Sequence, residues 1–207
     1  MSYINYEQWQ ELPLHRDPFD FFVIPRLFKP EFHEELNRDF PAIAKGGSYP
    51  LSGVLGGPSF ARLVDELRGD AFRAEIERKL EIDLAGRPTM VTLRGVSRVK
   101  DGEIHADSRT KLVTVLIYMN MRFTGDSGQL RLLRNDFDLE NYAAEVAPHM
   151  GTMVAFRCTP NAWHGHQRFV GERRSIQLNW LVDEGVARRE ERRHRVSALV
   201  KKLLPFG

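Results

Sequence analysis

The chain has 207 residues, of which 42% are hydrophobic and 28% charged, and its formal net charge at pH 7 is +2. This length suits one domain with a sizeable core, and the composition is that of an ordinary soluble globular protein. No apolar run approaches the roughly 20 residues that a membrane-spanning helix needs, so no membrane partner is expected. So small a net charge does not predict a nucleic-acid partner either.

The amino-terminal sequence MSYINYEQWQELPLHRD is polar and has no apolar h-region, which argues against a secretory signal. Cys158 is the single cysteine, so the chain cannot form an internal disulfide and suits a reducing compartment. No repeat or linker divides the sequence. We therefore expect a cytoplasmic protein with one domain over residues 1–207.

Residues 1–88 are predicted to be mainly helical. Apolar residues recur at helical spacing over 32–40, 60–67 and 71–80, and glycines and prolines between these segments indicate loops. From residue 89 the pattern changes to strands. The segments rich in apolar and β-branched residues are 89–99, 112–119, 128–133, 151–156 and 174–182.

Helices followed by several antiparallel strands are typical of an α+β domain whose strands close into a barrel or sandwich. We expect the strands to form a core over 89–183, with helices from 1–88 supporting one outer face. A basic C-terminal helix is predicted over 186–204, because seven lysines and arginines stand there against two glutamates. A solvated helix is the simpler interpretation of this charge, and an acidic partner or substrate is the alternative.

A metal site is predicted from histidines and an aspartate at strand ends. In His105-Ala-Asp107 the two functional side chains lie on one face of an extended chain, because successive residues alternate. His164 follows a later strand, and His166, with the same parity, is the alternative second histidine. Two imidazoles and one carboxylate form the facial triad of non-haem Fe(II) oxygenases. The spacing from His164 to Arg174 favours His164.

An arginine on the last strand predicts an anion site. Arg174 shares a strand face with Ile176 and Trp180, and an arginine pointing with them into a barrel is costly unless it meets an anion. A ligand carboxylate is one such partner, and a distant acidic side chain is the alternative. Arg173 is expected to point the other way. Tyr118 could donate a second hydrogen bond to the same carboxylate.

Four stretches within residues 90–182 carry a family resemblance: HADSRTKLVTVLIYMN, SGQLRLL, PHMGTMVAF and WHGHQRFVGERRSIQLNW. In this order they resemble the Fe(II)- and 2-oxoglutarate-dependent oxygenases, particularly the prolyl-hydroxylase-like branch. The resemblance implies a double-stranded β-helix, a jelly-roll or cupin-like barrel, with N-terminal support helices. It also implies residue roles: iron on His105, Asp107 and His164, and the distal carboxylate of 2-oxoglutarate on Arg174 and Tyr118.

The implied function is hydroxylation of an unactivated C–H bond, with release of succinate and CO2. The implied cofactors are Fe(II), 2-oxoglutarate and O2, with ascorbate as a candidate stimulant. Asp107 argues against halogenation, which needs a small residue at that position. A non-catalytic metal- and anion-binding β-barrel, acting as a sensor or binding module, is the alternative function.

One position departs from the family pattern. Arg94 stands where relatives often carry a second tyrosine, so the contributions of Arg94 and Arg173 to either binding pocket stay open. The substrate also stays open among a small molecule, a peptide and a carrier-bound group, and so does the oligomeric state.

Overall fold

The structure is a computed structural model that describes residues 2–203, without the side chains at 191, 194, 195 and 197–203. The helices are α1 (His33–Asp39), α2 (Pro58–Leu67), α3 (Asp70–Leu80) and α4 (Glu184–Leu203), with 3-10 turns η1 (Tyr6–Trp9), η2 (Pro30–Phe32) and η3 (Leu51–Gly53). The strands are β1 (Phe21–Ile24), β2 (Tyr49–Pro50), β3 (Thr89–Ser97), β4 (Lys111–Tyr118), β5 (Leu130–Leu133), β6 (Tyr142–Val146), β7 (Met153–Arg157), β8 (His164–Gly165) and β9 (Gly171–Leu181).

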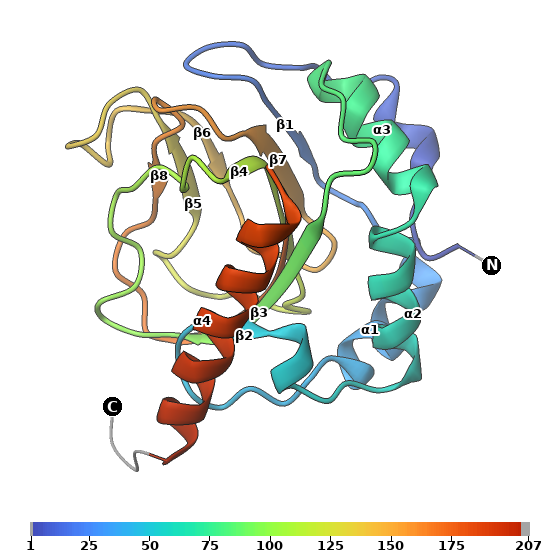
Figure 1. Cartoon of the computed structure of the whole chain (residues 1–207). Helices are drawn as coiled ribbons and strands as arrows, with labels where there is room; N and C mark the ends of the chain where they lie inside the picture. The colour runs from blue at the N-terminus through green and yellow to red at the C-terminus, as the bar shows by residue number, and fades with distance from the viewer. Residues whose placement is uncertain (1, 204–207) are drawn as a thin grey trace.

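Two antiparallel sheets form the centre of the molecule. The larger has six strands in the order β1-β7-β4-β9-β3-β2, and the smaller has three in the order β6-β5-β8. Helices α1, α2 and α3 cover one face of the larger sheet, and the smaller sheet lies toward the other face (Figure 1). The predicted α+β class with antiparallel strands is confirmed, although the strand pairs among residues 2–203 do not close into one continuous barrel.

Alternation along β9 decides which side chains meet the helices. Ile176, Leu178 and Trp180 belong to the main hydrophobic core, together with Phe72 of α3 and other apolar residues of the helices. The Trp180 and Phe72 rings stack with centroids 6.5 Å apart. Full burial of one such side chain contributes roughly 1.5–3 kcal/mol. The opposite face of β9 therefore points away from the helices, toward the smaller sheet.

A second apolar cluster joins the two sheets. It contains Tyr118 from β4, Leu130 and Leu132 from β5, and Val154 and Phe156 from β7. Because these side chains are buried against one another, the smaller sheet is held over one half of the larger sheet. The face of β3 and β9 beside this cluster is more polar.

The first 88 residues differ from their mainly helical prediction, because they also supply both edges of the larger sheet. β1 pairs with β7, and β2 pairs with β3. β1 has four residues and β2 only two, so neither is long enough to give a clear period-two pattern. The basic C-terminal helix is present as α4, and residue 204 of its predicted range lies outside the described residues. Within the described part, no helix is long and apolar enough to span a membrane.

Gly95 sits at an irregularity in β3, where the register with β9 shifts between Arg94 and Val96. A β-carbon on Gly95 would collide with the carbonyl oxygen and side chain of Ile43. We expect Gly95→Ala to lower the free energy of unfolding by about 1–3 kcal/mol, because the packed backbone must move. Urea unfolding of this variant beside Gly53→Ala would measure it. The Gly53 β-carbon meets only the Pro50 side chain, at 3.5 Å. Equal midpoints for the two variants would contradict the expectation.

Candidate active site

Two histidines meet through a backbone bridge between the segment before β4 and strand β8. The amide of His105 donates to the carbonyl of His164 at 3.0 Å, and the reverse bond measures 2.9 Å. Their ring centroids are therefore only 4.3 Å apart. Asp107 lies two residues beyond His105 on the same side. One ligand atom from each of the three residues lies within 4.8 Å of the others, a spacing suited to one metal ion.

Both imidazoles are oriented by backbone carbonyls. Nδ1 of His105 is 2.8 Å from the carbonyl oxygen of Glu103, and Nδ1 of His164 is 2.9 Å from that of Ala162. These contacts assign the proton to Nδ1 in each ring and leave Nε2 with its lone pair. Metal-ligating histidines are commonly fixed in this way by a carbonyl behind the ring. Both rings are thus prepared to bind a metal through Nε2.

The Asp107 carboxylate is held by two neighbours on β4. Nζ of Lys111 lies 2.6 Å from one oxygen, and the Thr114 hydroxyl donates to the other. Burial alone would raise the pKa of Asp107, but Lys111, the His164 ring and the two hydrogen bonds hold it below its usual value. Asn179 of β9 donates to the Thr114 oxygen at 2.7 Å. The carboxylate is therefore ionised and fixed in place.

The His164 ring is neutral near pH 7. Burial, followed by the neighbouring His105, lowers the pKa of His164 to about 4. A metal ligand must be an unprotonated imidazole, so this ring needs to release no proton before binding. An ionised carboxylate and a neutral imidazole side by side are the protonation states that a divalent metal requires.

Cys158 lies against this network, with Sγ 3.2 Å from the Thr114 hydroxyl. Burial, and then the charge of Asp107, raises the pKa of the Cys158 thiol to about 12. At pH 8 we expect iodoacetamide to alkylate it about a thousandfold more slowly than a free cysteine, because the thiolate is the reactive form. Since the chain has a single cysteine, the incorporated label measures this residue alone. Urea-unfolded protein, which should react at the ordinary rate, is the control.

Arg174 does not reach the predicted anion site. Its guanidinium lies on the helix-covered face of the larger sheet, where it donates to Asn37 of α1 at 3.0 Å and to Glu172 at 3.1 Å. Parity correctly gave it the same face as Ile176 and Trp180. That face, however, packs on the helices rather than lining the space between the sheets. The expectation that Arg174 points into the interior with Tyr118 is therefore wrong.

Arg173 takes the interior place instead. It is only 6% exposed, and it donates to the Tyr118 hydroxyl at 2.9 Å and to the carbonyl of Gly128 at 2.8 Å. Burial raises the pKa of Tyr118, so the phenol keeps its proton and can donate it to a further acceptor. Among the side chains that the structure describes, no carboxylate forms an ion pair or hydrogen bond with the Arg173 guanidinium. A buried guanidinium without a carboxylate partner is suited to binding an anionic ligand.

A cavity of about 170 Å³ opens beside the three candidate metal ligands. Leu116, Leu130 and Phe156 form its apolar side, and the inner faces of β3 and β9 form its polar floor. His166 is buried but lies outside the metal group. Its Nδ1 contacts the carbonyl of Gln167 at 2.8 Å. Of the two candidate second histidines, the structure therefore brings His164 to His105 and Asp107.

Residues 95–181 match the family model of the 2OG-Fe(II) oxygenase superfamily. The segment that carries the three candidate metal ligands therefore matches this superfamily. The oxygenases of this family use Fe(II), 2-oxoglutarate and O2, and these are the cofactors of the chain. No curated protein matches it.

Solved structures give the fold of the chain. A prolyl-4-hydroxylase from Pseudomonas putida has a TM-score of 0.53 at 18% identity, over 78% of this chain and 91% of that chain. A prolyl hydroxylase from Trichoplax adhaerens, solved with a peptide of hypoxia inducible factor, also gives 0.53 at 18%, over 78% and 83%. A viral collagen prolyl hydroxylase from Paramecium Bursaria Chlorella virus-1 gives 0.51 at 14%, over 77% and 93%. At these identities the likeness establishes a shared fold with prolyl hydroxylases.

Several residues of the candidate site were not predicted from the sequence. Lys111 and Thr114 hold Asp107, and Gln177 and Asn179 line the cavity from β9. A signal for the last two was present. Along 175–180 of β9, Ser175, Gln177 and Asn179 are polar, whereas the helix-facing Ile176, Leu178 and Trp180 are apolar. A polar strand face in a buried sheet is typical of a binding site.

Proposed function

We propose that this oxygenase is a 2-oxoglutarate-dependent hydroxylase, with iron on His105, Asp107 and His164 and the distal carboxylate of 2-oxoglutarate on Arg173 and Tyr118. One observation carries the proposal. A metal-ligand set with both Nε2 atoms free occurs in the same interior as a buried arginine that has no carboxylate partner among the described residues. The alternative Arg174 anchor is not proposed again, because that side chain lies on the other sheet face.

The donor set fits Fe(II). Two imidazoles and a carboxylate neutralise part of a divalent charge and leave positions open for further ligands. On metal binding, one oxygen of Asp107 would turn to the metal while the other keeps a hydrogen bond to Lys111 or Thr114. The site therefore needs no large rearrangement to accept the ion.

The co-substrate also fits. A carboxylate between Arg173 and Tyr118 would receive charge-assisted hydrogen bonds from the guanidinium and one from the phenol. Anchoring the distal end would orient the rest of the molecule toward the metal ligands before O2 arrives. The apolar wall of Leu116, Leu130 and Phe156 would exclude water from the cavity beside the metal ligands.

Bound iron, with O2 and 2-oxoglutarate, supplies the oxidation that inserts oxygen into a C–H bond and releases succinate and CO2. The chain supplies position and shelter. His105 and His164 present fixed nitrogen ligands, and Asp107 is held by its β4 neighbours. Arg173 and Tyr118 orient the co-substrate, and no side chain acts as a nucleophile.

Two finer features of the architecture belong to the same proposal. We propose that the two facing sheets constitute a double-stranded β-helix and that residues 1–207 form a single domain. The shared fold with prolyl hydroxylases supports the first, and the pairing of β1 and β2 with the core strands supports the second.

Calorimetric titration of 2-oxoglutarate into anaerobic protein, with and without Fe(II), tests the proposal. We expect binding only with the metal, followed in air by formation of succinate. A folded, iron-containing protein that binds no 2-oxoglutarate would overturn the proposal. Tight binding without any succinate in air would favour the non-catalytic binding module.

A further inference from the structure

A second arginine enters the interior beside the proposed co-substrate anchor. Arg94 of β3 is opposite Ser175 of β9, and Arg173 lies two residues before Ser175 on the same strand face. Arg94 and Arg173 are therefore diagonal neighbours. Arg173 is buried, whereas 40% of the Arg94 side chain is exposed. Two adjacent cations repel each other unless anions lie close to both.

Asp101 is the carboxylate nearest to the Arg94 guanidinium among the ion pairs of the described residues. Asp101 pairs with Arg98 at 3.3 Å and accepts the backbone amide of Arg98 at 2.8 Å. Its distance to the Arg94 guanidinium is 3.6 Å, longer than a hydrogen bond. Arg94 and Arg98 thus share one acidic partner, which Arg98 already engages, and Arg173 has no carboxylate partner among the described side chains. If 2-oxoglutarate neutralises Arg173, Arg94 is left with capacity for a further anion.

Arg94 lies in the cavity that also contains the three candidate metal ligands. The polar floor around it is completed by Thr92 from β3 and by Gln177 and Asn179 from β9. Arg173 and Tyr118 are not part of this lining. The two arginines therefore differ in their surroundings: Arg173 lies against the Tyr118 hydroxyl, and Arg94 lines the cavity beside the metal ligands.

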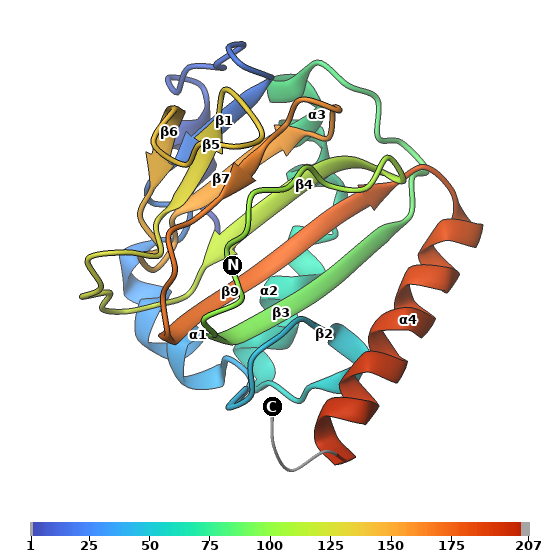
Figure 2. The same ribbon diagram turned by 90° about the vertical axis from the view of Figure 1, so that its left-hand side faces the viewer.

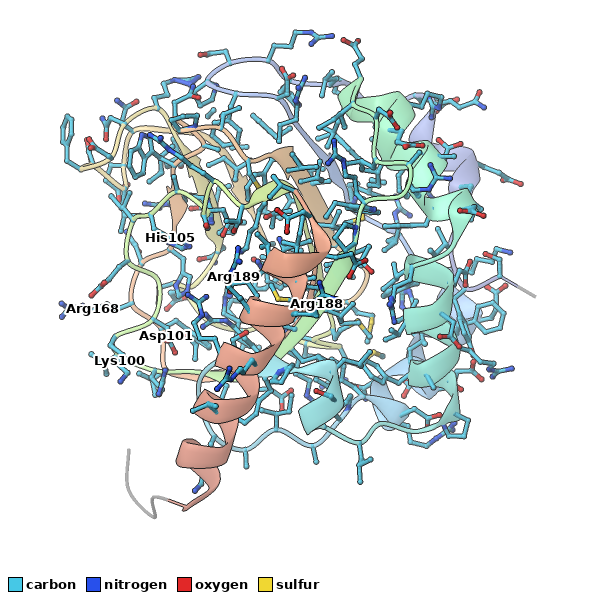
Figure 3. The ribbon with its side chains drawn as sticks, viewed as in Figure 1. Lys100, Asp101, His105, Arg168, Arg188 and Arg189 are labelled. Atoms are coloured by element: carbon cyan, nitrogen blue, oxygen red, sulfur yellow. The ribbon has the colours of Figure 1, made fainter. Side chains whose placement is uncertain are left out.

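The opening has walls on two sides. The segment between β3 and β4, which carries His105, crosses in front of the larger sheet, and α4 runs along the edge formed by β2 and β3 (Figure 2). Glu190 and Arg193 of α4 line the cavity. Figure 3 labels three further cations outside this lining, Arg188 and Arg189 on α4 and Lys100 on the segment between β3 and β4. A cavity of about 170 Å³ between such walls suits a small molecule.

We propose that the primary substrate of this oxygenase is a small polar molecule with a carboxylate group, and that Arg94 binds that carboxylate. This inference rests on the proposed function, and it names the substrate class for the same site. Gln177 and Thr92 would contact the polar remainder of the substrate. The reacting C–H bond would then lie between Arg94 and the metal ligands.

Manganese provides a test without turnover. Mn(II) replaces Fe(II), calorimetry establishes saturation with 2-oxoglutarate, and proton relaxation of added probes then reports molecules that approach the paramagnetic ion. The probes are N-acetyl-L-amino acids and the matching N-acetyl-L-amino acid amides, which differ in carboxylate charge. Zn(II)-loaded protein gives the diamagnetic baseline. We expect enhanced relaxation for acids and not for amides, with an enhancement that falls about tenfold in Arg94→Met.

Matched variants make each outcome decisive. Arg157→Met, on the helix-facing side of β7, should behave as wild type. Arg94→Met and Arg94→Gln should both keep 2-oxoglutarate affinity within about threefold, which also shows an intact site. An equal relaxation enhancement for acids and amides would overturn the inference, and so would the absence of enhancement for every probe. Either result would leave the proposed function intact. Loss of 2-oxoglutarate binding in both Arg94 variants would also overturn it, by assigning Arg94 to the co-substrate.

Discussion

Replacing Asp107 with alanine should abolish iron binding and, with it, the turnover of 2-oxoglutarate. Asp107 is the only anionic member of the three-residue group, and its carboxylate is held toward the two Nε2 atoms by Lys111 and Thr114. Loss of an outer-shell partner commonly costs 10–100-fold in metal affinity, so loss of the ligand itself should cost at least about a hundredfold. Anaerobic titration of Fe(II), with succinate formation as the second readout, measures both effects.

Glu103→Ala is the matched control for this change. Glu103 is an acidic residue of the same segment with an exposed side chain, and only its backbone carbonyl contacts His105. The substitution keeps that carbonyl, so iron affinity and turnover should stay near wild type. Iron binding by Asp107→Ala at wild-type affinity would show that the metal lies elsewhere.

The grouping of His105, Asp107 and His164 could be predicted because it depends on local rules. Side chains two residues apart in an extended segment lie on the same face, and residues at the end of a strand are accessible. What the sequence could not supply is the long-range pairing that brings His164 to His105 through the bridge between β8 and the segment before β4. The order of histidines and strands in the family resemblance supplied that information.

The anion site shows where the same reasoning stops. Parity separated Arg173 from Arg174 on β9, but parity does not say which sheet face is covered by helices and which faces the second sheet. That choice depends on the packing of α2 and α3 against Ile176 and Trp180, which are contacts between segments far apart in the chain. The more apolar strand face met the helices, and the mixed face, with Arg173, became the interior of the site.

Short elements were lost for a related reason. β2 and β8 have two residues each, so no window of sequence carries their pattern. Their positions are fixed by the longer strands beside them, since β2 pairs with β3 and β8 pairs with β5. An element of this length has no intrinsic preference strong enough to predict, and tertiary contacts decide its conformation.

Arg173→Met should weaken 2-oxoglutarate binding by about thirtyfold or more, whereas Arg174→Met should leave it unchanged. Truncation of one partner of a buried, hydrogen-bonded charge pair costs ~2 kcal/mol or more, because the ligand carboxylate loses its cation in a space closed to water. Arg173 is buried beside the Tyr118 hydroxyl. Arg174 is occupied by Asn37 and Glu172 on the other face of β9, so its removal changes a supporting contact with α1.

The two arginine variants form a pair in which adjacent residues of one strand receive the same substitution. Calorimetry on Mn(II)-loaded protein gives the 2-oxoglutarate affinities, and the rise in melting temperature with saturating 2-oxoglutarate gives an independent value, because a ligand stabilises only the state that binds it. The rise should be present in wild type and Arg174→Met and nearly absent in Arg173→Met. The reverse pattern would restore Arg174 as the anchor. It would also require the register of β9 to shift by one residue, which would move Ile176 and Trp180 out of the helix-facing core.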